Sequence, residues 1–244
     1  MLGAAFKLTA QTEVNLQTST VFYFPAGSWC DIFSPETECM NLDEGSFPEL
    51  STMPHEVYVH LYEGHIVPMQ DAATLGVMNT AELMDHPVDF HILGNPDNSF
   101  KLDWYAQGTY INDDGLVFDH TGTYNHYELA AYPEPDGSGS ITVIVSIIAS
   151  ATAATDDTIP DCTDVNTNDI LGNLYFYNSV FLSMDGVASY DTTVNYAGDS
   201  VDPTVYNDSA RYDDATQRVV FENPQTEQIC LPNVTKIVLT PVTA

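Results

Sequence analysis

Basic residues are scarce in this sequence. Five lysines and arginines stand against 35 aspartates and glutamates, which gives a formal net charge of −30. Nucleic-acid binding requires a continuous basic surface, but the basic residues are scattered along the chain, at Lys7, Lys101, Arg211, Arg218 and Lys236. Nucleic acid is therefore excluded as a partner, and anionic membrane surfaces are disfavoured for the same reason. Because protonation of carboxylates relieves self-repulsion, the composition favours a secreted protein or one in an acidic, lysosome-like vesicle.

Long apolar segments are also lacking. The longest, residues 141–154, is interrupted by Thr and Ser and is too short to cross a bilayer, so we predict no membrane span. The first seven residues, MLGAAFK, have neither a charged leader nor a proper apolar segment, and they do not resemble a signal peptide. We therefore expect a processed or partial product with a further segment upstream.

Cysteines are few but even in number, which permits three pairings. Cys30 and Cys39 lie close together in one half of the chain, and Cys162 and Cys230 lie far downstream. The simplest expectation is one bridge in each half, Cys30–Cys39 and Cys162–Cys230, which would indicate an oxidising compartment. The alternative is four free thiols in a cytosolic protein. No C-x-x-C pair is present, so a zinc site is disfavoured.

Two glycosylation sequons support the secretory interpretation without establishing it, because such triplets often arise by chance. They are Asn207-Asp208-Ser209 and Asn233-Val234-Thr235.

The apolar pattern predicts an all-β fold with two consecutive antiparallel β-sandwich modules. No long helical stripe is present, and clusters of Gly, Pro, Asp and Asn separate short strand-like runs. We expect a lead-in over 1–20, a proximal sandwich over 21–94 and a distal sandwich over 95–244 with a surface loop near 149–168. The expected strands cover 21–24, 57–62, 66–67, 88–93, 100–105, 109–112, 116–119, 124–132, 141–148, 174–184, 217–222 and 235–239.

Four segments then resemble the C-terminal, non-catalytic part of family 31 α-glucosidases. MLGAAFKLT, at the start, is similar to the exit from the family's catalytic barrel, and YFPAGSWCD from Tyr23 is similar to its Y-x-P-x-G-x-W-x-D motif. VHLYEGHIVPMQ from Val59 resembles V-H-L-R-x-G-x-I-I-P-x-Q, and GTYINDDG from Gly108 resembles the G-x-L-Y-x-D-D-G turn. One departure is Tyr62-Glu63, where the family commonly has Arg followed by a small residue.

The resemblance implies a structural role for its motif residues. These are Pro25, Gly27, Trp29, Asp31, Gly64, Pro68, Asp113, Asp114 and Gly115. Pro25 and Gly27 should turn the chain, Gly64 and Pro68 should end adjoining strands, and Asp114-Gly115 should form a tight hairpin turn.

The resemblance also implies that the catalytic aspartates lie on a barrel outside this sequence. The nucleophile motif, like W-x-D-M-N-E, is not found, so no catalytic residue and no cofactor is assigned. We expect the partner to be a catalytic barrel from the same precursor or from a separate chain. Two alternatives are a self-assembling extracellular subunit, forming homo-oligomers or filaments, and a carbohydrate-binding module that stacks aromatic residues on a glucan.

Other residues allow weaker functional hypotheses. Asp113 and Asp114 could form an acid/base pair or, with Asn112 and Asp119, a calcium site, but a hairpin corner explains them without further assumptions. The pairs His60/His65 and His86/His91 have a spacing that puts them on opposite faces of a strand, which disfavours a metal site. A sugar-stacking surface would use Trp104, Tyr105, Tyr124, Tyr127, Tyr132, Tyr175, Phe176 and Tyr177.

Overall fold

The computed structural model describes most of the chain. The described residues are 19–33, 39–51, 58–70, 72–95, 104–113, 124–150, 167–177, 187–198, 201–213, 218–223 and 228–243. The chain divides into two compact units, Met1–Glu63 and Gly64–Ala244. None of the helices in the described ranges is long and apolar enough to cross a membrane.

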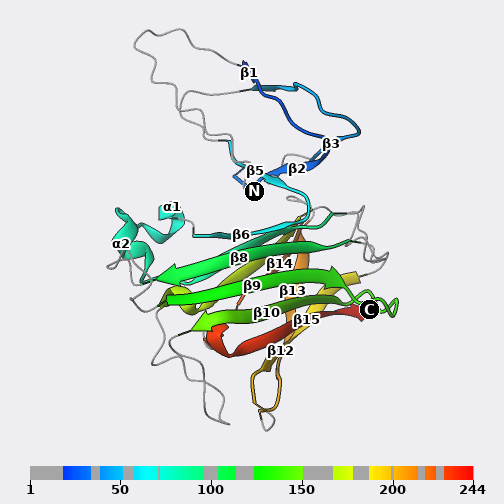
Figure 1. Cartoon of the computed structure of the whole chain (residues 1–244). Helices are drawn as coiled ribbons and strands as arrows, with labels where there is room; N and C mark the ends of the chain where they lie inside the picture. The colour runs from blue at the N-terminus through cyan, green and yellow to red at the C-terminus, as the bar shows by residue number, and fades with distance from the viewer. Residues whose placement is uncertain are drawn as a thin grey trace. The chain divides into compact units, whose positions relative to one another are not determined.

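The smaller unit contains two short antiparallel sheets (Figure 1). In one, β1 (Ser19–Val21) pairs with β4 (Glu49–Ser51). In the other, β2 (Gly27–Asp31) lies between β3 (Met40–Leu42) and β5 (His60–Tyr62). The central strand is buried from Ser28 to Asp31, because both of its edges are paired and its side chains pack on neighbouring aromatic rings.

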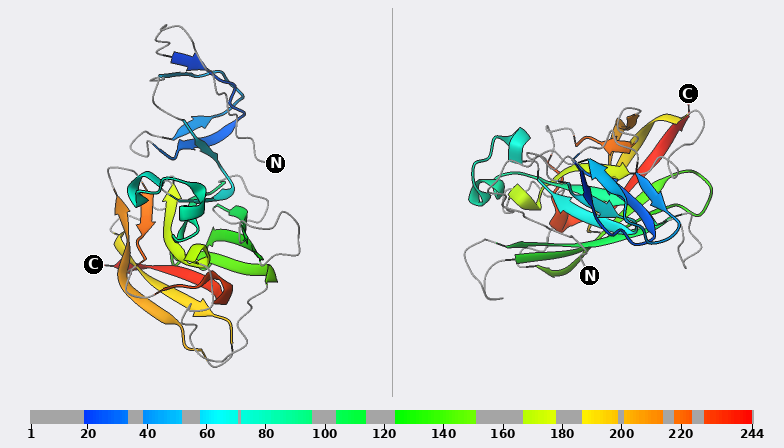
Figure 2. Two further views of the ribbon diagram at one scale, coloured as in Figure 1. Left: turned by 90° about the vertical axis from the view of Figure 1, so that its left-hand side faces the viewer. Right: turned by 90° about the horizontal axis from the view of Figure 1, so that it is seen from above.

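The larger unit is built from ten strands that form one closed barrel, in the order β10-β15-β12-β13-β14-β11-β7-β6-β8-β9. Its elements in chain order are β6 (His65–Met69), α1 (Ala72–Leu75), α2 (Thr80–Leu83), β7 (Val88–Leu93), β8 (Ala106–Asp113), β9 (Tyr124–Pro133), β10 (Ile141–Ser150), η1 (Thr167–Asp169), β11 (Leu171–Tyr177), β12 (Val187–Tyr196), β13 (Thr204–Asp213), β14 (Arg218–Phe221), η3 (Leu231–Asn233) and β15 (Val234–Thr243). Figure 2 shows these strands wrapping around a common interior.

The all-β prediction is confirmed, but the arrangement differs from two antiparallel sandwiches. Strands β6 and β7, on one side of the expected boundary near residue 94, share a single sheet with β8 to β15 on the other side. Two of the pairings are parallel, β6 with β8 and β7 with β11. These parallel pairings place the antiparallel pair β6 and β7 between β8 and β11, and one closed sheet results.

Alternation along the strands produces the core of this unit. In β12, for example, Tyr190, Thr192, Val194 and Tyr196 are buried while the residues between them are partly exposed. One continuous apolar cluster draws on strands from β6 to β15. Its largest fully buried aromatic side chains are Tyr127, Tyr190, Phe90, Phe176 and Phe221.

Several expected turns can be compared with the structure. Gly64 has φ +76° and forms the turn from β5 into β6, as expected. Pro68, in contrast, lies inside β6 and does not end it. Proline is tolerated there because β6 meets β8 only at His65, so the proline needs no N–H for that ladder. The expected hairpin joins β8 to β9, but Asp114 and Gly115 lie outside the described residues.

Gly108 allows the closest approach between β6 and β8. A Cβ atom on this residue would lie 2.2 Å from the backbone oxygen of Ile66. We predict that Gly108→Ala lowers the free energy of unfolding of the larger unit by about 2–3 kcal/mol, as overpacking against rigid backbone does. Urea unfolding followed by circular dichroism would measure this change.

The neighbouring Gln107→Ala is the matched control, because this exposed side chain should change stability by less than about 0.5 kcal/mol. Equal stability of the two variants would show that β6 and β8 do not approach this closely.

Candidate functional site

The family-like motif of the smaller unit is organised around Trp29, in the middle of β2. The Trp29 indole N–H donates a hydrogen bond to the Pro25 carbonyl oxygen, at 3.0 Å. Its ring lies 4.4 Å from the Tyr62 ring and meets the Phe24 ring edge-on at 5.2 Å. Trp29 therefore holds the turn at Pro25 against the sheet, which is a structural role.

Gly27 and Glu63 complete this arrangement. Gly27 has φ +124°, and a Cβ atom there would lie 2.7 Å from the Tyr62 ring and 2.8 Å from Glu63 Oε1. The other carboxylate oxygen of Glu63 accepts a hydrogen bond from the Ser28 N–H, and the Glu63 N–H donates to the Ser28 carbonyl oxygen. Tyr62 and Glu63, which depart from the family pattern, thus make their own contacts with β2, and those of Glu63 extend the pairing of β2 with β5 to Ser28.

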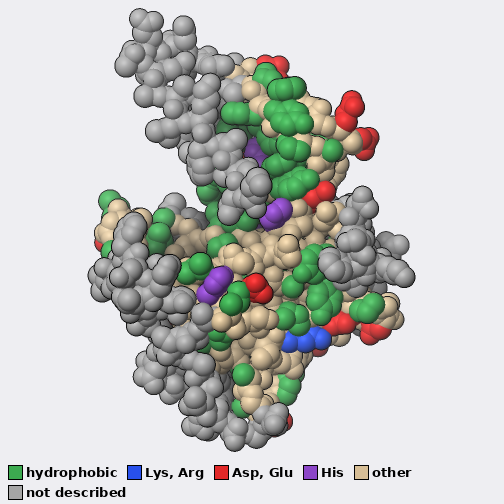
Figure 3. Space-filling model, in the orientation of Figure 1, with side chains coloured by type: hydrophobic (Ala, Val, Ile, Leu, Met, Phe, Trp, Pro, Cys, Tyr) green, Lys and Arg blue, Asp and Glu red, His purple; other side chains and the backbone are tan. Residues whose placement is uncertain are grey.

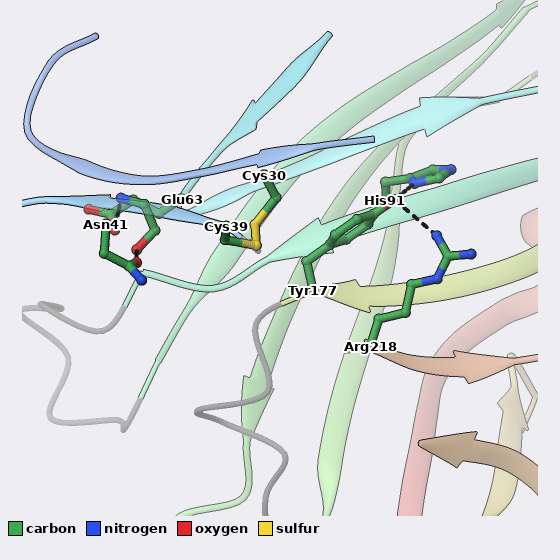
Figure 4. The surroundings of a disulfide bond; sticks show 8 residues. Cys30, Cys39, Asn41, Glu63, His91, Tyr177 and Arg218 are labelled. Atoms are coloured by element: carbon green, nitrogen blue, oxygen red, sulfur yellow. Dashed lines mark hydrogen bonds between the residues drawn. A yellow bond between two sulfur atoms is a disulfide. The ribbon is translucent and has the colours of Figure 1, made fainter. Parts of the chain in front are cut away.

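The predicted Cys30–Cys39 disulfide is present (Figure 4). Cys30 is buried in β2, and the bridge joins this strand to the residue that precedes β3. Cys230 is also disulfide-bonded, whereas Cys162 lies outside the described residues, so its pairing remains a prediction.

Asp31 ends β2, where its carboxylate accepts a hydrogen bond from the Phe33 N–H at 3.0 Å. Burial lowers the pKa of the nearby His60, although the negative charge of Asp31 opposes the shift.

A polar cluster in the larger unit joins β7, β11 and β14 (Figure 4). The parallel pairing of β7 with β11 sets Tyr175 opposite His91, and the pairing of β11 with β14 sets Arg218 opposite Tyr177. His91 Nδ1 lies 2.6 Å from the Tyr177 hydroxyl, to which Arg218 donates from Nη1 at 3.3 Å. The Arg218 guanidinium also stacks over the Tyr175 ring, 4.6 Å from its centroid.

This cluster keeps His91 uncharged. Burial, and then the positive charge of Arg218, lowers the pKa of His91 from 6.5 to about 4. The Tyr177 hydroxyl thus accepts from Arg218 and also shares a hydrogen bond with His91 Nδ1. A neutral, hydrogen-bonded histidine of this kind stabilises the junction of three strands.

A second buried cluster surrounds Asp169 in η1. Its two carboxylate oxygens accept hydrogen bonds from Asn125 Nδ2 at 2.7 Å and from the Tyr127 hydroxyl at 2.6 Å. Burial, followed by the negative charge of Asp169 and the hydrogen bond to it, raises the pKa of Tyr127. The cluster anchors η1 to the inner face of β9, because an unpaired buried carboxylate would be costly.

These clusters do not match the sites expected for a metal ion. The described ranges hold no group of three or more His, Cys, Asp or Glu side chains arranged to bind one. The calcium site suggested by the sequence cannot be assembled from the described residues. Asn112 is buried and the Asp113 side chain is not described. Asp114 and Asp119 lie outside the described residues.

Four of the eight aromatic residues suggested for sugar stacking are buried. These are Trp104, Tyr127, Phe176 and Tyr177, of which Tyr127 stacks on the Tyr110 ring and Tyr177 lies against the His91 ring. Tyr105, Tyr132 and Tyr175 are partly buried, and the Tyr124 side chain is not described. The buried members of this set cannot stack on a sugar in the folded protein.

Large hydrophobic side chains are exposed on both units, and four of them belong to the smaller unit (Figure 3). They are Val21, Tyr23, Phe33 and Phe47, each more than half exposed, and the Tyr23 and Phe47 rings lie 5.1 Å apart. We call these four residues the aromatic patch. The sequence argument from strand periodicity missed it, because Tyr23, Phe33 and Phe47 all lie outside the strands.

The glycosylation candidates lie in different surroundings. Asn207 is exposed in β13, and Asn233 is buried at the end of η3.

No protein-family model matches this chain. Its fold is nevertheless similar to part of several solved glucosidase structures. The glucosidase II α subunit bound to Glc1Man2 matches with 16% sequence identity and a TM-score of 0.60, over 95% of this chain and 22% of that chain. The Tris-bound α subunit matches with 15% identity and a TM-score of 0.61, over 94% and 22%. An ER glucosidase II heterodimer, of a catalytic subunit and the binding domain of a regulatory subunit, matches with 15% identity and a TM-score of 0.60, over 96% and 22%. The likeness establishes the fold, over a small part of those proteins.

His91 should make the larger unit sensitive to acid. Its pKa is near 6.5 when unfolded and about 4 when folded, so the unfolded chain binds the proton more tightly between these values. Stability is therefore complete above pH 6.5 and falls as the pH drops to 4, by roughly 3 kcal/mol from this residue. We predict that His91→Gln reduces the difference in unfolding free energy between pH 7 and pH 4 by about this amount, measured by urea unfolding.

The exposed His65 provides the control, and His65→Gln should retain the full difference. An unchanged pH dependence in the His91 variant would show that this histidine does not remain neutral on folding.

Proposed function

We propose that this chain is the C-terminal β-sheet region of a family 31 α-glucosidase-like protein, and that it supports a catalytic barrel without performing the chemistry itself. The observation that carries the proposal is the fold likeness, which spans 94–96% of this chain but only 22% of the glucosidase chains. The ordered motifs around Trp29, Gly64 and Gly108 support the same assignment from the residues.

The internal contacts favour a scaffold. The carboxylate of Asp169 and the imidazole of His91 are both buried and hydrogen-bonded to neighbouring side chains. Retaining glycosidases need two carboxylates about 5–5.5 Å apart on either side of the scissile bond. Asp169 instead meets an amide and a phenol, so this cluster orders the fold and does not form such a pair.

The aromatic patch is the surface that we assign to the barrel contact. Monomeric proteins seldom leave several adjacent aromatic rings in water, and such patches commonly mark protein interfaces. Tyr23 and Phe47 are 57% and 67% exposed, and their rings lie 5.1 Å apart, so both present ring surface to solvent.

We further propose that the protein works in the lumen of the secretory pathway. The Cys30–Cys39 bridge supports this, because disulfides persist in oxidising compartments. The buried, neutral His91 favours a compartment near neutral pH over a strongly acidic vesicle, since the stability of the larger unit falls below pH 6.5.

Isolation of the native protein tests the proposed function. We expect the chain to elute in a complex larger than its own 26.8 kDa and together with a polypeptide that hydrolyses an α-glucoside. The separated chain alone should show no turnover. Hydrolysis by the isolated chain, elution as a monomer, or homopolymers visible by electron microscopy would each contradict the proposal.

The aromatic patch allows a sharper test of the contact. Phe47→Ser should weaken association with the catalytic polypeptide at least about tenfold, as loss of a central aromatic contact does. Titration by biolayer interferometry would measure the change in Kd. Ile111→Ser is the matched control, because Ile111 is 59% exposed on β8 of the larger unit. Equal changes in Kd for both substitutions would contradict the assignment of the aromatic patch to the interface.

A further inference from the structure

Strand β13 contains an irregularity where it runs beside β12. The two strands are in register at Tyr190 with Ala210 and at Thr192 with Tyr206. One residue of β12, Asp191, therefore faces three residues of β13, Asn207 to Ser209. Such a bulge leaves its extra residues outside the ladder and bends the strand outward.

The bulge is held by specific contacts on both sides. The Asp208 N–H donates to Asp191 Oδ1 at 2.8 Å, and Arg211 donates to the Asp208 carboxylate at 3.0 Å. Asp208 has φ +50°, a left-handed conformation that Asp and Asn tolerate better than other residues with side chains. Strain of this kind persists only where its surroundings enforce it, so the outward turn is a built feature of the strand.

These contacts present a glycosylation sequon to solvent. Asn207 is exposed, and no hydrogen bond to its side chain is found among the described residues. The hydroxyl of Ser209, the third residue of the sequon, donates to the Tyr206 carbonyl oxygen at 3.0 Å and lies 2.7 Å from the Thr192 hydroxyl, from which it accepts.

The second sequon is placed quite differently. Asn233 is only 4% exposed, where η3 leads into β15. Its own N–H donates to the Cys230 carbonyl oxygen, and its carbonyl oxygen accepts from the Ala197 N–H. A bulky, hydrated glycan cannot be accommodated on a side chain at this position without displacing the segment.

We propose that Asn207 carries an N-linked glycan and that Asn233 does not. The donor would be an oligosaccharide activated as a lipid diphosphate, with a transferase of the secretory pathway as catalyst. A bond forms between Asn207 Nδ2 and the anomeric carbon while the bond from that carbon to the phosphate oxygen breaks. The lipid diphosphate leaves with the electron pair, and the amide loses one proton. The disulfide at Cys30–Cys39 independently supports exposure to that compartment.

The modification has a consequence for assembly. A glycan on the bulge keeps the outer face of β12 and β13 hydrated, so a protein partner must bind elsewhere on the chain. The proposal itself does not depend on the proposed glucosidase partnership, because it is argued from the bulge and from the surroundings of the two sequons alone.

Site mapping on the native, secreted protein tests the proposal. Treatment with peptide N-glycosidase in heavy-oxygen water should release one glycan and leave a labelled aspartate at position 207, with position 233 unlabelled. Asn207→Gln should abolish the mass loss on deglycosylation, and Ser209→Thr, which keeps a sequon hydroxyl, should retain it. Asn233→Gln should leave the glycan unchanged.

Two results would overturn the proposal. One is native protein that loses no mass on deglycosylation, and the other is a labelled aspartate at position 233. A folded Asn207→Gln variant, confirmed by an unchanged circular dichroism spectrum, that still loses a glycan would count equally against it.

Discussion

Closure of the ten-stranded sheet depends on the two parallel pairings that insert β6 and β7. Without them, β8 and β11 would each present an unpaired edge, which invites pairing with other chains. The β6–β8 contact requires that a backbone approach another backbone at Gly108, and the β7–β11 contact joins segments about eighty residues apart. Once both form, the inner faces of all ten strands bury one apolar cluster. The clusters at His91 and Asp169 are both positioned by this closure.

The two buried polar clusters illustrate how such a fold keeps reactive groups inactive. The Asp169 carboxylate lies in a low-dielectric interior, where it requires hydrogen-bond donors. Asn125 and Tyr127 supply them. His91 is hydrogen-bonded to the Tyr177 hydroxyl, whose oxygen also accepts from Arg218. Each group is satisfied by neighbours that cannot move without opening a strand pair. Rigidity of this kind fits the supporting role proposed above.

Sequence reasoning recovered the elements whose own composition is decisive. Strands such as β7, β9 and β10 are rich in β-branched and aromatic residues, and they were predicted close to their observed bounds. Strands β12 and β13 were missed, because polar residues such as Asp191 and Asn207 conceal the inward alternation. In β12 the signal was nevertheless present, since Tyr190, Val194 and Tyr196 recur at even spacing. The His91 cluster could not be predicted, since parallel pairing between distant segments leaves no local pattern.

The residues that match the family motifs include positions where the backbone conformation restricts the residue type. Gly27 and Gly64 both have positive φ, and Trp29 fills the space beneath the turn that Gly27 makes. Tyr62 and Glu63, where the sequence differs from the family pattern, make contacts of their own. At Tyr62-Glu63 the phenol donates to the Ala26 carbonyl oxygen, and the carboxylate accepts from the Ser28 N–H. These contacts hold Tyr62 and Glu63 against β2, and the fold likeness extends to structures of 14–16% identity although no family model matches.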